Sequence, residues 1–190
     1  MSTNIILCGV GGQGTVLASK LLAAAAMAKG IKVMSAETIG MAQRGGSVFS
    51  HLRIGNDAET PMMAKGEADM IIGFEPAEAV RLLPFLKEDG CVVVNLKPIM
   101  PVTASLGGMN YIGTEMLDYL KSKVKKLIIV DGDKACEDIG SPKVLNMVLL
   151  GAAVHSGVLD ISDEEIKKAI EKKVKPQFVE MNFKAIDYVK

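Results

Sequence analysis

The sequence lacks tryptophan, and aromatic residues make up only 4% of its 190 residues, whereas apolar residues make up 49%. Aliphatic side chains and methionine must therefore fill the core. This composition favours an α/β fold, with aliphatic contacts between helices and sheet, over an aromatic-rich β-sandwich. A chain of this length suits one domain and can bury a substantial core.

Net charge is also lacking, because 22 basic and 22 acidic side chains cancel. A neutral chain has no field that holds a nucleic-acid backbone or an anionic membrane, so we expect neither as a partner. No apolar run reaches about 18 residues, the length that suggests a membrane-spanning helix. The start shows no secretory signal, since strand-like residues begin by Ile5. We expect a cytoplasmic protein.

Cysteines are few, odd in number and far apart: Cys8, Cys91 and Cys136. Two of them lie in apolar, strand-like runs, which is typical of reduced thiols packed as small hydrophobic residues. The pattern indicates neither a disulfide framework nor a metal site. It also excludes an iron–sulfur cluster within this chain, because four closely organised thiolates are normally needed.

Short apolar runs alternate with helical patterns along most of the chain. Buried strands are predicted at residues 4–10, 31–36, 69–73, 91–96 and 127–130, and an alternating strand, which can run antiparallel, at 47–54. Helices are predicted at 15–29, 77–86, 113–125, 144–158, 163–174 and 178–189. Ser141 is expected to cap a helix, and Ser162 with Glu165 forms a capping box.

This order of elements predicts a fold class and a domain organisation. Alternating strands and helices followed by a helical tail indicate an α/β fold, a Rossmann-like doubly wound, mostly parallel sheet with a helical C-terminal region. We expect a single domain over residues 1–190. Its α/β core is expected at 1–140, with a helical tail at 141–190 packed on it.

The sharpest motif is glycine-rich and lies between the first strand and the first helix. Its glycines fit the G-x-G-x-x-G pattern of dinucleotide-binding turns, and Glu37 ends the second strand, where such folds place an acid for the ribose. In that pattern Gly9 permits the turn, Gly11 lets a phosphate approach and Gly14 lets helix and strand pack closely. The glycines also suit a plain strand-to-helix turn. The motif comprises Gly9, Gly11, Gly12, Gln13 and Gly14.

A second motif is the loop that precedes the alternating strand, Met41-Ala42-Gln43-Arg44-Gly45-Gly46-Ser47. An arginine beside two glycines and a hydroxyl group suits a phosphate or carboxylate ligand. It suits a rigid partner-contacting loop, or a solvated loop, equally well. Because loops after strand ends gather at the ligand-binding edge of an open sheet, we expect Arg44, Gly45, Gly46 and Ser47 near the glycine turn.

No catalytic set emerges from the sequence. His51 and His155 are more than 100 residues apart, without carboxylates or cysteines at ligand spacing, and are expected to be structural or surface residues. Asp131-Gly132-Asp133 has the wrong order for a thiamine-diphosphate motif, and Asn146 is too close to serve it. We therefore predict no catalytic residue and no metal ligand in this chain.

Three segments together resemble the gamma-type domain of 2-oxoacid:ferredoxin oxidoreductases. They are GVGGQGTVLASKLLAAAA, SAETIGMAQRGGSVFSHLRIG and ADMIIGFEPAEAVR. Their order and spacing match over essentially the whole chain. The Met-Ala-Gln-Arg-Gly-Gly-Ser loop with the following His-Leu-Arg is most similar to the smaller subunit of the indolepyruvate type.

The resemblance implies a function that the residues alone do not show. Such complexes oxidatively decarboxylate a 2-oxo acid with coenzyme A, giving acyl-CoA, carbon dioxide and reduced ferredoxin. Thiamine diphosphate and iron–sulfur clusters lie on large partner chains, and ferredoxin is the acceptor. The family pattern implies that the glycine turn and the Arg44 loop face the partner subunit, coenzyme A or the mouth of the active site. A stand-alone NAD- or FAD-binding oxidoreductase and a purely structural interaction domain remain the alternatives.

Overall fold

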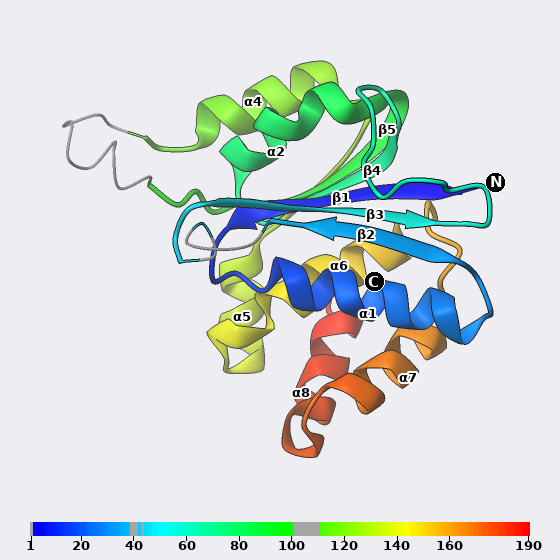
Figure 1. Ribbon diagram of the computed structural model, residues 1–190. Helices are drawn as coiled ribbons and strands as arrows, with labels where there is room; N and C mark the ends of the chain where they lie inside the picture. The colour runs from blue at the N-terminus through cyan, green and yellow to red at the C-terminus, as the bar shows by residue number, and fades with distance from the viewer. Residues whose placement is uncertain (1, 39–41, 43, 101–110) are drawn as a thin grey trace.

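The computed structural model describes residues 2–38, 42, 44–100 and 111–190, and in this part of the chain six strands form one sheet (Figure 1). Neighbouring strands β1, β4, β5 and β6 are parallel, whereas β3 runs antiparallel to both β1 and β2. This confirms the predicted mostly parallel sheet. The strands, in the order in which they lie side by side, are β2 (Val33–Glu37), β3 (Ser47–Ile54), β1 (Thr3–Val10), β4 (Ala68–Gly73), β5 (Leu86–Asn95) and β6 (Lys126–Val130).

Helices cover both faces of this sheet. Figure 1 shows α2 and α4 on one face, and α1, α6 and the remaining helices on the other. Among the described residues, no helix has both the length and the apolar character that a membrane span requires. The α-helices are α1 (Thr15–Ala28), α2 (Pro76–Leu82), α4 (Thr114–Lys123), α5 (Gly132–Ile139), α6 (Leu145–His155), α7 (Asp163–Lys173) and α8 (Pro176–Asp187).

Two segments differ from the predicted elements. The helix expected to reach residue 86 ends at Leu82, because a 3-10 turn at Leu83–Phe85 (η2) follows and β5 already begins at Leu86. Helix α5 was not predicted at all. It is short and mostly polar, and its ends are defined by the Asp131 side chain, which accepts from the Lys134 amide at 3.1 Å, and by left-handed Gly140.

The helical C-terminal region is built around α6. Every residue from Asn146 to Val154 is buried, because α6 lies between the sheet and α8, and this explains why it is apolar all round. Gly151 permits the closest approach, since a Cβ there would lie 2.2 Å from the Ile186 carbonyl oxygen. A second 3-10 turn at Pro142–Val144 (η3) precedes α6 and is capped by the Ser141 hydroxyl, as expected.

Candidate functional site

The two glycine-rich motifs are joined at the carboxyl end of β1. Val10, the last residue of β1, pairs with Ser47, the first residue of β3. The pairing continues into the loops: the Gly11 amide donates to the Gly46 carbonyl at 2.8 Å, and the Gly45 amide donates to the Gly11 carbonyl at 3.2 Å. The expected proximity of the two motifs is therefore confirmed. Met41 and Gln43 of the predicted loop lie outside the described residues.

The structure explains the need for glycine in this turn by contacts within the protein rather than by room for a phosphate. A Cβ on Gly9 would lie 2.6 Å from Gln13 Oε1 and 2.7 Å from Phe74 Cβ, so Gly9 makes room for side chains rather than for a ligand. Gly14 begins α1 with φ +85°, and a Cβ there would lie 2.6 Å from Asn146 Nδ2. The Gly11 amide is already bonded to the Arg44 loop, so it is not free for a pyrophosphate.

Gly12 is the exception, because its surroundings are open. It has φ +105°, a conformation that favours glycine, and a Cβ on it would meet no atom within 4 Å. Helix α1 follows at once, and its N-terminus has no side-chain cap and no acidic residue in its first turn. The first amides of α1 therefore lie beside open space, where a negatively charged group is favoured.

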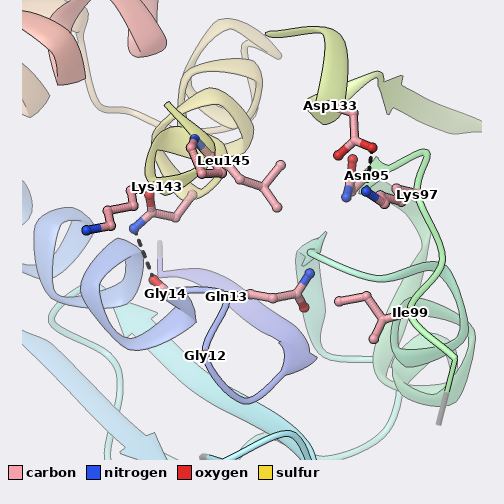
Figure 2. Close-up of a pocket in the computed structure, with 11 residues that line it drawn as sticks. Gly12, Gln13, Gly14, Asn95, Lys97, Ile99, Asp133, Lys143 and Leu145 are labelled. Atoms are coloured by element: carbon pink, nitrogen blue, oxygen red, sulfur yellow. Dashed lines mark hydrogen bonds and ion pairs between the residues drawn. The ribbon is translucent and has the colours of Figure 1, made fainter. Parts of the chain in front are cut away.

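A hollow of about 490 Å³ lies between the glycine turn, the segment that follows β5, and the starts of α5 and α6 (Figure 2). Asn95 and Asn146 line it from buried positions at the end of β5 and in α6. Lys97 forms an ion pair with Asp133 at 2.6 Å, and this hydrogen bond and charge raise the pKa of Lys97. Lys143 forms no ion pair with any residue that the structure describes.

Sequence reasoning missed this half of the site. Asn95, Lys97 and Lys143 belong to no motif of the sequence, and Asp133 and Asn146 were weighed for a thiamine motif that the sequence analysis rejected. In the structure, Asp131 caps α5 and Asp133 binds Lys97. The one available signal was position, since Asn95 and Lys97 follow the most evident strand of the sequence.

A second hollow, of about 570 Å³, lies on the other side of the glycine turn. It shares Gly12 and Gly14 with the first hollow and is also lined by Lys20 of α1 and Glu37 of β2. Strand β3 separates β2 from β1, so Glu37 is one strand farther from the turn than it would be if β2 paired directly with β1. Glu37 nevertheless reaches the hollow beside the turn.

The Arg44 loop is bonded to one of two buried carboxylates at the start of α2. The Ser47 hydroxyl donates to Glu78 Oε2 at 2.5 Å, and Arg81 pairs with the same oxygen at 3.3 Å. Glu75 accepts from the Glu78 amide at 3.0 Å and from the Tyr111 hydroxyl at 2.5 Å. Burial, together with the Glu75 hydrogen bond, raises the pKa of Tyr111. Arg44 itself is exposed.

The histidines and cysteines have the structural positions that the sequence indicated. His51 is buried in β3, its Nδ1 accepts from the Met63 amide at 3.3 Å, and burial lowers its pKa. Burial raises the pKa of the three free thiols, Cys8, Cys91 and Cys136. In the described ranges no group of three or more histidine, cysteine, aspartate or glutamate side chains is arranged to hold a metal ion.

The structure is a Rossmann-like α/β fold with a polar, hollowed edge at the carboxyl ends of its parallel strands. Comparison with known proteins narrows the class. A family model described as pyruvate ferredoxin/flavodoxin oxidoreductase matches residues 4–189. The chain belongs to this family, as a gamma-type subunit of a 2-oxoacid:ferredoxin oxidoreductase.

Relatives of two types support this assignment. Indolepyruvate oxidoreductase subunit IorB of Pyrococcus horikoshii is 38% identical, with 97% of this chain and 92% of that protein covered. The pyruvate/ketoisovalerate oxidoreductases common subunit gamma of Pyrococcus abyssi is 34% identical, with 93% and 89% covered. The crystal structure of pyruvate oxidoreductase subunit PORC from Thermotoga maritima has a TM-score of 0.72 at 25% identity, with 99% and 94% covered.

Proposed function

We propose that this chain is the subunit without firmly bound cofactor of an indolepyruvate-type complex. The complex oxidatively decarboxylates an aryl or branched 2-oxo acid with coenzyme A to acyl-CoA, carbon dioxide and reduced ferredoxin. Thiamine diphosphate and the iron–sulfur clusters are held by the large partner subunit, and ferredoxin accepts the electrons. The sequence similarity to indolepyruvate oxidoreductase subunits over nearly the whole chain supports the substrate type. We assign residues 1–190 to one gamma-type domain.

The observation that carries the proposal is the joined edge. The glycine turn and the Arg44 loop are bonded to each other, and two hollows adjoin the turn. An edge whose two motifs are hydrogen-bonded to each other but which is not filled by its own side chains suits a surface completed by another subunit and a co-substrate. We assign to this edge Gly9, Gly11, Gly12, Gln13, Gly14, Arg44, Gly45, Gly46 and Ser47.

Coenzyme A is the co-substrate that we place against this edge. Its phosphates are anionic, and the hollow of about 490 Å³ offers Lys97 and Lys143 beside the uncapped start of α1. Lys143→Ala should raise the KM for coenzyme A several-fold in the assembled complex, since one cation is removed from the ligand's surroundings. Lys168→Ala, on the exposed surface of α7, is the matched control and should leave this KM unchanged.

Co-purification from the native host tests the proposal as a whole. We expect a large chain to accompany this one, and the complex to reduce a viologen dye only when thiamine diphosphate, coenzyme A and a 2-oxo acid are supplied. The isolated chain should be inactive. A fully active complex that lacks this chain would overturn the proposal, as would a purified chain that associates with no such partner.

A dinucleotide is the second candidate ligand, because Glu37 lines the hollow beside Gly12 and Gly14. The occupied Gly11 amide counts against it. Thermal unfolding with NAD(H) decides the matter: a dinucleotide protein should be stabilised, and Glu37→Ala should abolish the shift. An unchanged unfolding temperature with NAD(H) and with FAD would eliminate this candidate.

A further inference from the structure

Two side-chain amides converge on one backbone carbonyl at the centre of the binding edge. Gln13 Nε2 donates to the Phe74 carbonyl oxygen at 2.9 Å, and Asn95 Nδ2 donates to the same oxygen at 3.3 Å. A carbonyl oxygen has two lone pairs, so the two bonds can exist together. Gln13 lies in the glycine turn, and Asn95 lies at the end of β5, 82 positions later in the chain.

The other end of each amide is also bonded to the backbone. Gln13 Oε1 accepts from the Val10 amide at 2.7 Å, and Asn95 Oδ1 accepts from the Gly132 amide at 3.2 Å. A continuous chain of hydrogen bonds therefore runs across the carboxyl ends of β1, β4 and β5 to the start of α5. In both side chains the oxygen faces an N–H and the nitrogen faces a carbonyl, so only an amide satisfies both ends.

Each amide is matched by a glycine that leaves room for it. A Cβ on Gly9 would lie 2.6 Å from Gln13 Oε1, and a Cβ on Gly132 would lie 2.6 Å from Asn95 Oδ1. Gly9 in the turn and Gly132 at the start of α5 are thus packed directly against the two amides. The same two amides line the hollow of about 490 Å³. The hydrogen bonds of the two amides therefore join two segments that line this hollow, the glycine turn and the end of β5.

We propose that Asn95 and Gln13 are positioning residues, which act through the shared Phe74 carbonyl to hold the glycine turn in register with the start of α5. Figure 2 shows Gln13 in the glycine turn and Asn95 beside Lys97 and Asp133, and both residues line the hollow. The role in co-substrate binding rests on the proposed function. The coupling between the two amides does not, because it follows from the hydrogen bonds alone.

Asn95→Asp breaks this arrangement with almost no change of shape. The retained oxygen still accepts from Gly132, whereas the new oxygen faces the Phe74 carbonyl, and two acceptors repel each other. Gln13→Glu makes the same change from the other side. Asn182→Asp is the matched control, because Asn182 is also buried and its Nδ2 donates to the Phe178 carbonyl at 2.7 Å, but in α8.

Two measurements separate positioning from general stability. In the assembled complex, Asn95→Asp should raise the KM for coenzyme A on the order of tenfold with kcat nearly unchanged, as expected for losing one buried hydrogen bond. In the isolated chain, hydrogen exchange of the amides at residues 12–17 should accelerate in Asn95→Asp. Asn182→Asp should change neither the KM for coenzyme A nor the exchange at residues 12–17, even if it lowers the unfolding temperature as much as Asn95→Asp does.

The outcomes distinguish the two proposals. An inactive wild-type complex would overturn the proposed function but not the positioning role, which the exchange experiment still decides. Unchanged exchange at the glycine turn in both Asn95→Asp and Gln13→Glu would overturn the positioning role. Equal KM values for Asn95→Asp and Asn182→Asp would overturn its part in co-substrate binding.

Discussion

The binding edge and the helical layer of α6, α7 and α8 use polar side chains in different ways. At the edge, half-buried Gln13 and the buried Asn95 and Glu75 bind backbone groups of segments far away in the sequence, and hollows remain between them. In the helical layer, polar side chains join helix ends, as His155 does with Asp163. The backbones of α6 and α8 are in close contact at Gly151.

The difference shows that hydrogen bonds from side chains to the backbone hold the binding edge, whereas close packing holds the helical layer. Side chains that bind the backbone fix the course of loops that have no regular hydrogen bonds of their own. The backbone groups of a helix already form hydrogen bonds within the helix. Close packing and a few side-chain hydrogen bonds at the helix ends are therefore sufficient. Substitutions in the helical layer should therefore lower the stability of the chain, whereas substitutions on the edge should alter binding more than stability.

The largest loss of stability is expected from Gly151→Ala, at the closest contact of the helical layer. The new methyl group would overlap the Ile186 backbone, which cannot rotate away, so we expect a loss of about 3 kcal/mol. Urea unfolding of the isolated chain measures it. Gly30→Ala is the control: Gly30 has φ +75° but open surroundings, so about 1 kcal/mol is expected. Equal losses would show that α6 and α8 are not closely packed there.

His155→Ala should have the next largest effect. His155 Nδ1 lies 2.7 Å from the Val189 carbonyl oxygen and Nε2 lies 2.6 Å from Asp163 Oδ1, so the side chain fastens α6 to the start of α7 and the end of the chain. Losing both contacts should cost about 2 kcal/mol in chemical unfolding. The KM for coenzyme A of the assembled complex should not change, and a rise comparable to that of Asn95→Asp would contradict the separation of the two regions.

Protonation of Asp163 should have a smaller effect on stability, and this effect should appear only at acid pH. Burial alone would raise the pKa of Asp163, but hydrogen bonds from Lys190 and His155 outweigh burial and lower it. A lowered pKa in the folded state means that the carboxylate stabilises the fold above its unfolded pKa, and that this contribution is lost as pH falls through the folded value. Wild-type stability should decline below about pH 4, and Asp163→Asn should flatten that decline. An identical acid profile for both proteins would disprove the assignment.

Arg44→Ala should have the smallest effect on the chain itself. Arg44 is exposed on the edge, so the unfolding temperature should stay within about 1 °C of the wild type. Binding to the large partner should weaken, which a titration of the two separate chains measures. Unchanged turnover of the assembled complex would favour a structural interaction role for the loop, whereas a lower turnover would place Arg44 near the reacting groups.

Local sequence patterns predicted much of the fold because their physical causes are local. The capping box of Ser162 and Glu165 is complete in the structure, since both partners lie within one helical turn. The antiparallel strand β3 was visible in its alternation. Helix α5 was missed because a short polar helix has no strong periodicity, and its ends depend on Asp131 and Gly140.

The candidate site was predictable only in part. The glycine turn and the Arg44 loop were found from their composition, and Ser47 proved to bind Glu78 beneath the loop. Asn95 and Glu75 were not found, because each acts through contacts that no local pattern contains. Glu75, for example, binds Tyr111, which lies 36 positions later in the chain.

The sequence by itself determined the alternation of strands and helices and the place of the glycine-rich turn between the first strand and the first helix. The tertiary structure alone decided why several of those glycines are required. Gly9 leaves room for Gln13 and Phe74, and Gly14 leaves room for Asn146. Gly132, which the sequence did not single out, leaves room for Asn95 in the same way. The space around a Cβ and the partners of a buried amide depend on residues brought together by folding, and spacing along the chain does not specify them.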